Sequence, residues 1–112
     1  MSILKKKKVS RFDASNTATH GNTVTINEKS GEAIFTDNIA AGTGSELTVN
    51  NDKFKVGQKI NPELEYDFQG SGNGFPILMG YTMTAGQCIF NVLNVDQGVD
   101  AGSPKIIRFQ IS

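Results

Sequence analysis

The sequence predicts an all-β fold: a small antiparallel β-sandwich, immunoglobulin-like or jelly-roll-like, with an extended N-terminal arm. From residue 17 onward, short runs rich in Thr, Val, Ile and Phe are separated by turn residues, about every 8 to 12 positions, as in sandwiches and barrels. No run carries apolar residues at helical spacing over three turns. The 112 residues suffice for one domain with one core. We therefore predict an arm over residues 1–16 and a sandwich domain over residues 17–112, with about seven strands.

The first part of the predicted sandwich contains three short strands. Residues 23–27 (TVTIN) alternate, with Val24 and Ile26 on one face, and residues 33–37 (AIFTD) follow the turn EKSGE. These two strands are close enough along the chain to form a hairpin. Residues 46–51 (ELTVNN) form the third strand.

The middle of the chain predicts two further strands with a break between them. Residues 56–60 read as a weak strand across Gly57, and residues 64–68 alternate more clearly. Pro62 lies between them and cannot donate a hydrogen bond to a neighbouring strand, which indicates a sheet edge or a break.

The last three predicted strands supply most of the core. They cover residues 75–84, 87–95 and 105–112. Residues 87–95 (QCIFNVLNV) are apolar on both faces, which predicts a buried central strand. The side chains that we expect to be buried in the last two strands are Ile89, Val92, Ile107 and Phe109.

The composition narrows the classes of function. Lys plus Arg and Asp plus Glu both total 11, so no net field attracts nucleic acid or an anionic membrane. Nucleic acid and membrane are therefore not expected as partners. No apolar run approaches the ~18 residues of a membrane span, and the N-terminal lysines precede no signal-like apolar segment. A single cysteine, Cys88, allows no internal disulfide and fits a reducing compartment such as a cytoplasm.

The sequence predicts no metal site and no cofactor. His20 is expected in a loop without a carboxylate or thiol at ligand spacing, and Cys88 is expected in the core. The glycine-rich residues 69–74 run into another strand instead of a helix N-terminus, so they do not resemble a phosphate-binding loop. Asp96 and Asp100 lack the dense spacing of a calcium loop and are explained as turn residues.

A hydrolase on a β-scaffold is the enzymatic alternative. Glu63 and Glu65 alternate onto one face of a predicted strand and are the only paired acids that could serve it. A polar outer face explains the same pattern more simply. We therefore predict no catalytic residues and no enzymatic activity.

The N-terminal arm is the predicted site of partner binding. It combines a run of basic residues with apolar ones, so it can be attracted to an acidic surface and also bury contact area there. The candidate partner-binding residues are Ile3, Leu4, Lys5, Lys6, Lys7, Lys8, Val9, Arg11 and Phe12.

Residues 33–112 resemble small β-sandwich proteins of tailed bacteriophage virions, of the capsid decoration and head-fibre type. The resemblance rests on the segments AIFTDNIAAGTGSELTVNN, GSGNGFPIL, AGQCIFNVLNV and KIIRFQIS. It implies a virion structural protein, made in the bacterial host cytoplasm, that acts as a capsid decoration (cement) protein on the outside of the shell. The implied partners are the major capsid protein and further copies of the chain, with a trimer favoured.

The resemblance leaves a second function open. A head- or tail-fibre module could instead recognise a host-surface glycan or another virion protein. Such a module would display aromatic side chains on a sheet face or a loop cluster, and this chain has no Trp and only Tyr66 and Tyr81 as tyrosines.

Overall fold

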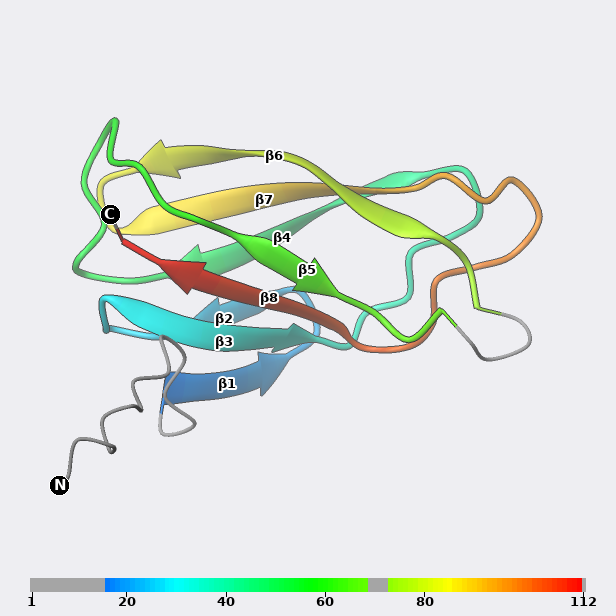
Figure 1. Ribbon diagram of the computed structural model, residues 1–112, viewed down its shortest axis with the longest axis horizontal. Helices are drawn as coiled ribbons and strands as arrows, with labels where there is room; N and C mark the ends of the chain where they lie inside the picture. The colour runs from blue at the N-terminus through cyan, green and yellow to red at the C-terminus, as the bar shows by residue number, and fades with distance from the viewer. Residues whose placement is uncertain (1–15, 69–72, 112) are drawn as a thin grey trace, which may run out of the picture.

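The structure is a computed structural model that describes residues 16–68 and 73–111. All the candidate partner-binding residues of the arm lie outside the described residues. In the described part of the chain, two four-stranded sheets pack face to face, and no α-helix is present (Figure 1). The predicted all-β fold with two packed sheets is confirmed.

The strand orders of the two sheets are β1-β3-β8-β5 and β2-β4-β7-β6, and in each sheet the first pair is parallel and the other two pairs are antiparallel. The eight strands are β1 (Thr17–His20), β2 (Thr23–Thr25), β3 (Ser30–Phe35), β4 (Gly44–Asn50), β5 (Glu63–Glu65), β6 (Pro76–Thr84), β7 (Gln87–Asn94) and β8 (Lys105–Gln110).

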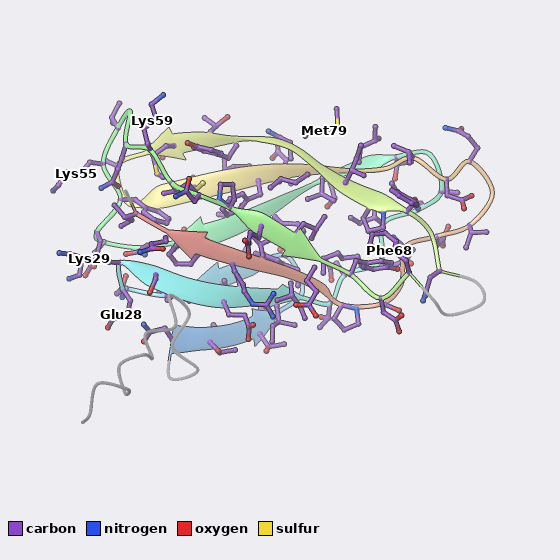
Figure 2. All side chains as sticks on the ribbon, viewed as in Figure 1. Glu28, Lys29, Lys55, Lys59, Phe68 and Met79 are labelled. Carbon is purple, nitrogen blue, oxygen red and sulfur yellow. The ribbon has the colours of Figure 1, made fainter. Side chains whose placement is uncertain are left out.

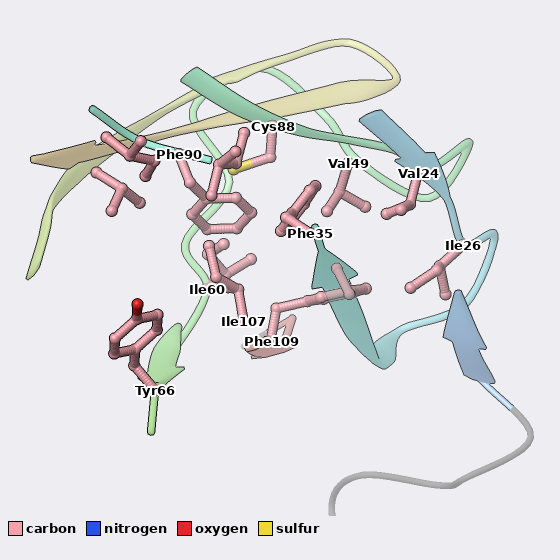
Figure 3. Close-up of a cluster of buried hydrophobic side chains, with 14 of the residues drawn as sticks. Val24, Ile26, Phe35, Val49, Ile60, Tyr66, Cys88, Phe90, Ile107 and Phe109 are labelled. Atoms are coloured by element: carbon pink, nitrogen blue, oxygen red, sulfur yellow. The ribbon is translucent and has the colours of Figure 1, made fainter. Parts of the chain in front are cut away.

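The core lies between the sheets and is built by period-2 alternation (Figure 3). In β8 every second residue is buried, and in β7 the burial pattern is the same. The Phe109 ring from one sheet meets the Phe54 ring edge-on, with centroids 5.5 Å apart. Val92, Ile107 and Phe109 are buried as predicted, whereas Ile89 is only half-buried because it points to the outer face of β7.

The sheets are mixed and not purely antiparallel. β1 runs parallel to β3 in one sheet, and β2 runs parallel to β4 in the other. The predicted hairpin between residues 23–27 and 33–37 is therefore wrong, since β2 and β3 belong to different sheets. Val24 and Ile26 do face the core, as predicted. Alternation specifies which face of a strand is buried but not which strand it pairs with.

The chain between β4 and β5 differs from its prediction. Residues 56–60 form no strand: Gly57 adopts a positive φ of 76° in a turn, and Ile60 makes only an isolated bridge to Ile111. β5 lies at the edge of its sheet, which confirms the expectation from Pro62. β7 lies between β4 and β6, which confirms the predicted central strand.

Among the described residues, no helix has the length and apolarity to cross a membrane.

Candidate functional site

The predicted arm joins the body at one end of the sandwich. Asn16, the first described residue, donates a hydrogen bond from Nδ2 to the carbonyl oxygen of Ser30, 3.1 Å away, at the start of β3. The backbone oxygen of Asn16 also lies close to Gly31, where a Cβ would approach it to 2.9 Å. The chain therefore enters the body beside the turn between β2 and β3.

The exposed lysines of the body lie at this same end of the sandwich. Lys29 is in the turn between β2 and β3, and the others are in residues 51–62, which connect β4 to β5. Figure 2 labels three of them together at the end where the N-terminus leaves the body. We call this the basic end, and its lysines are Lys29, Lys53, Lys55 and Lys59.

A buried asparagine holds the two segments of the basic end together. Asn51 is 1% exposed, and its Nδ2 donates to the carbonyl oxygen of Glu28 at 2.5 Å, while its Oδ1 accepts from the backbone N–H of Lys53 at 2.9 Å. The backbone N–H of Asp52 donates to Asn27 Oδ1 at 2.9 Å. These bonds place Lys29 and Lys53 on adjoining segments, although they are distant in sequence.

The opposite end of the sandwich carries acidic residues in the loops that follow β3, β5 and β7 (Figure 1). We call it the acidic end, and its carboxylates are Asp37, Asp67, Asp96 and Asp100. The basic end also carries two exposed carboxylates, Glu28 and Asp52, and Asp52 lies 3.8 Å from the Nζ of Lys53. Its four lysines outnumber them, so the two ends still differ in the sign of their excess charge.

A second buried asparagine organises the acidic end. Asn94 is fully buried, and its Nδ2 donates to the carbonyl oxygens of Ile39 at 3.1 Å and Val99 at 2.9 Å. Its Oδ1 accepts from the backbone N–H of Phe75 at 2.9 Å and of Asp96 at 3.2 Å. One side chain therefore ties together the three loops of this end.

The aspartates of the acidic end are engaged with loop backbone, as turn residues are. Asp96 Oδ1 accepts from the backbone N–H groups of Gly98 and Val99, at 2.9 and 3.0 Å. Asp100 accepts from the Asn38 side chain and the Ala41 backbone N–H, and these bonds hold its pKa below the usual value. In residues 16–68 and 73–111, no cluster of three or more His, Cys, Asp and Glu side chains is arranged to hold a metal ion.

Of the two acids considered for a hydrolase, Glu63 and Glu65, the second forms an ion pair with an arginine. Arg108 on β8 bonds Glu65 on β5 and, at 2.8 Å, Glu32 on β3. Hydrogen bonding to Glu65, aided by the charges of both carboxylates, raises the pKa of Arg108. This network links three strands across the outer face of one sheet, so Glu65 has a structural role.

The other ionisable residues singled out in the sequence lie apart from one another. His20 ends β1 and is exposed, and is not in a loop as predicted. Cys88 is fully buried in β7, as predicted, and burial raises the pKa of its thiol to about 12. A nucleophile with so high a pKa is protonated at neutral pH and unreactive.

The body lysines and a buried lysine are features that the sequence reasoning missed. The group of exposed body lysines could have been found from the sequence, because the exposed lysines outside the arm fall in only two short segments. Lys105 alternates with Ile107 into the core, and its Nζ donates to the carbonyl oxygen of Asp37. Desolvation lowers the pKa of Lys105, although the charge of Asp37 opposes the shift.

Comparison with protein-family models, curated proteins and solved structures finds no match to this chain. The functional argument therefore rests on the residues, on their arrangement and on the resemblance of the strand and turn segments.

Proposed function

We propose that this protein is a bacteriophage virion structural protein that decorates the outside of the major capsid shell. It is made in the host cytoplasm and attaches, as a homo-oligomer, to the surface of the virion. The proposal assigns it no catalytic activity and no cofactor. The observation that carries the proposal is that Asn16, through which the arm joins the body, is bonded to Ser30 at the end that carries the body lysines.

This arrangement suits attachment to an acidic surface. The five basic residues of the arm, Lys5 to Lys8 and Arg11, are joined to an end that presents four more exposed lysines. Exposed charges act together only within about a Debye length, roughly 8 to 10 Å at moderate salt, so an arm that joins the body beside its lysines can bring both sets of charges to the same acidic surface. The apolar arm residues add contact area that salt does not screen.

We assign the sandwich to the jelly-roll-like type in preference to the immunoglobulin-like type. Eight strands in two four-stranded sheets support this assignment, because jelly rolls have eight strands in two sheets. The two parallel pairs that involve β1 and β2 depart from a purely antiparallel jelly roll.

Deleting residues 1–12 tests the proposed attachment. We expect the truncated protein to keep its β-type circular dichroism spectrum but to occupy undecorated capsids less than the full-length protein, at both low and moderate salt. Bound copies per capsid would be measured by co-sedimentation. Equal occupancy by both proteins at both salt concentrations would show that the arm is not the anchor.

A recognition module at the tip of a fibre is the second candidate. It is favoured by exposed aromatic rings at the acidic end: Phe68 and Phe75 are 49% and 50% exposed, and their centroids lie 4.8 Å apart. Tyr66 meets Phe68 edge-on at 5.2 Å. Binding to a glycan array that is lost in a Phe68→Ala/Phe75→Ala variant, with no binding to capsids, would favour this candidate.

A further inference from the structure

β6 is the longest edge strand of the two described sheets, with Pro76 at its start and a bulge between Leu78 and Gly80. The strand order leaves β1, β5, β2 and β6 at the edges of the two sheets, and three of these span only three or four residues. β6 has nine residues, PILMGYTMT, none of them charged, and β7 is its only ladder partner among the described strands. Natural proteins shield long edges with charges, prolines, bulges or short strands, because unpaired backbone groups recruit another strand. β6 has the proline and the bulge but no charged side chain along its nine residues.

The exposed large apolar side chains of the described residues lie either in β6 or in segments next to its ends, and they are Val56, Phe68, Phe75, Met79 and Val95. Met79, 60% exposed, is in β6 itself (Figure 2). Phe75 precedes β6, contacts the ring of Phe68, and accepts a backbone hydrogen bond from Val95 at 3.0 Å. Val56 is 76% exposed.

The segment that carries Val56 is held against the other end of β6. The backbone N–H of Ile60 lies 3.4 Å from the hydroxyl oxygen of Tyr81, in the second half of the strand. The N–H of Gly86, just after β6, donates to the carbonyl oxygen of Phe54 at 3.0 Å. Exposed apolar side chains therefore stand before β6 (Phe75), near its middle (Met79) and beside its far end (Val56), with the exposed Thr82 and Thr84 between the last two. We call this row of residues along β6 the strip.

The two ends of the strip carry opposite charges. Lys55 and Lys59 flank Val56 at the basic end. Asp67 and Asp96 adjoin Phe68 and Val95 at the acidic end. The strip is thus uncharged in the middle, positive at one end and negative at the other.

We propose that this strip is a self-association surface on which the β6 strands of two copies pair antiparallel about a two-fold axis. Antiparallel pairing reverses one copy, so the lysines beside Val56 in each copy face the aspartates beside Phe75 in the other. In this arrangement no like charges meet along the paired strands. A two-fold axis requires a surface that is complementary to itself, and this strip meets that requirement because its positive end faces the negative end of the other copy. The two β2-β4-β7-β6 sheets become one continuous eight-stranded sheet.

The pairing makes a dimer the basic unit, in place of the trimer that the resemblance implies. It is independent of the capsid role, because it rests on β6 and the segments at its ends and not on Lys29 or on the residues of the arm. The association is measured on the isolated full-length protein, so its failure does not affect the test of capsid attachment.

The first experiment measures mass by sedimentation equilibrium over a range of concentrations. We expect a reversible dimer, and a Lys55→Glu/Lys59→Glu variant that dimerises about tenfold or more weakly because like charges then meet at both ends. The matched single variants are Lys55→Glu, which should also weaken the dimer, and Lys29→Glu, which makes the same change of charge in the turn between β2 and β3 and should dimerise like the wild type. A monomer or trimer at all concentrations, or equal weakening by both single variants, would overturn the proposal.

The second experiment locates the interface by oxidative cross-linking. A two-fold axis near the middle of β6 brings the two copies of residue 79 near each other, so Met79→Cys should give a disulfide-linked dimer. Thr23→Cys, on the opposite edge strand of the same sheet, is the matched control and should remain unlinked, as should the wild type, whose Cys88 is buried. Cross-linking through Thr23→Cys and not through Met79→Cys would place the interface elsewhere and refute the proposal.

Discussion

Cys88 and Lys105 are buried ionisable side chains whose pKa values burial shifts in opposite directions. The thiol of Cys88 is neutral when protonated, so desolvation raises its pKa to about 12. The ammonium of Lys105 is charged when protonated, so desolvation lowers its pKa. In both cases the low-dielectric interior favours the neutral form.

The opposite shifts have opposite effects on stability at alkaline pH. Above the unfolded-state pKa of Cys88, near 9.0, the unfolded chain loses the thiol proton while the folded protein keeps it, so stability falls as pH rises. For Lys105 the folded pKa lies below the unfolded pKa. Between these two values the folded protein has lost the ammonium proton while the unfolded chain keeps it, so stability rises as pH rises.

Cys88→Val should therefore reduce the loss of stability at high pH. The variant removes the thiol but keeps Lys105, so the difference between the two proteins isolates Cys88. We expect the wild type to lose up to about 2 kcal/mol relative to the variant between about pH 7 and pH 10.5, by the ~1.4 kcal/mol per unit that a pKa shift represents. Urea unfolding at a series of pH values measures it, and a pH-independent difference would contradict the assignment of the shift.

At the scale of the elements, each end of the sandwich is organised by a buried asparagine. Asn51 lies directly after β4 and joins its loop to the turn before β3, while Asn94 ends β7 and joins three loops. A buried amide can donate and accept at once, so one side chain satisfies the backbone groups of several loops. The loops at both ends thereby acquire defined positions.

Replacing Asn94 should destabilise the acidic end strongly. Asn94→Ala removes this partner from the N–H of Phe75 and from the carbonyl oxygen of Val99, at about 1 to 3 kcal/mol for each group left unsatisfied. Asn91→Ala, on the outward face of the same strand, is the matched control and should cost under about 1 kcal/mol. Denaturant unfolding compares the two variants, and equal losses would show that Asn94 does not organise the loops.

At the scale of the whole molecule, the separation of charge gives the sandwich an orientation. The exposed lysines, which outnumber Glu28 and Asp52 beside them, lie at one end of the 50 × 34 × 20 Å body, and Asp37, Asp67, Asp96 and Asp100 lie at the other. A body with balanced total charge can therefore still approach an acidic surface with one end first.

The body lysines should contribute to attachment even when the arm is intact. We expect Lys29→Gln/Lys53→Gln to lower capsid occupancy several-fold at low salt and less at high salt, because screening already weakens exposed charges there. The matched control, Thr36→Glu/Gln97→Glu, makes the same change of net charge at the acidic end and should bind like the wild type. If both variants bind equally weakly, net charge and not its position controls attachment.

The amino-acid sequence by itself determined the fold class, most strand positions and most of the core. Alternation in β7 and β8 identified Val92, Ile107 and Phe109 as buried, because a strand's two faces are distinguished by its own residues. It also predicted the edge position of β5 from Pro62, since a missing backbone donor is a local property.

Only the tertiary structure decided which strands pair, which side chains share an end and where the exposed edge lies. The parallel pairing of β1 with β3 and of β2 with β4 depends on how the two sheets divide the chain, which no single segment encodes. Ile89 was wrongly predicted to be buried, because an apolar residue on an outer face cannot be distinguished from a core residue until the position of the second sheet is known. The basic end and the β6 strip likewise combine residues far apart in the sequence, and their meeting is a consequence of long-range contacts that local propensity does not specify.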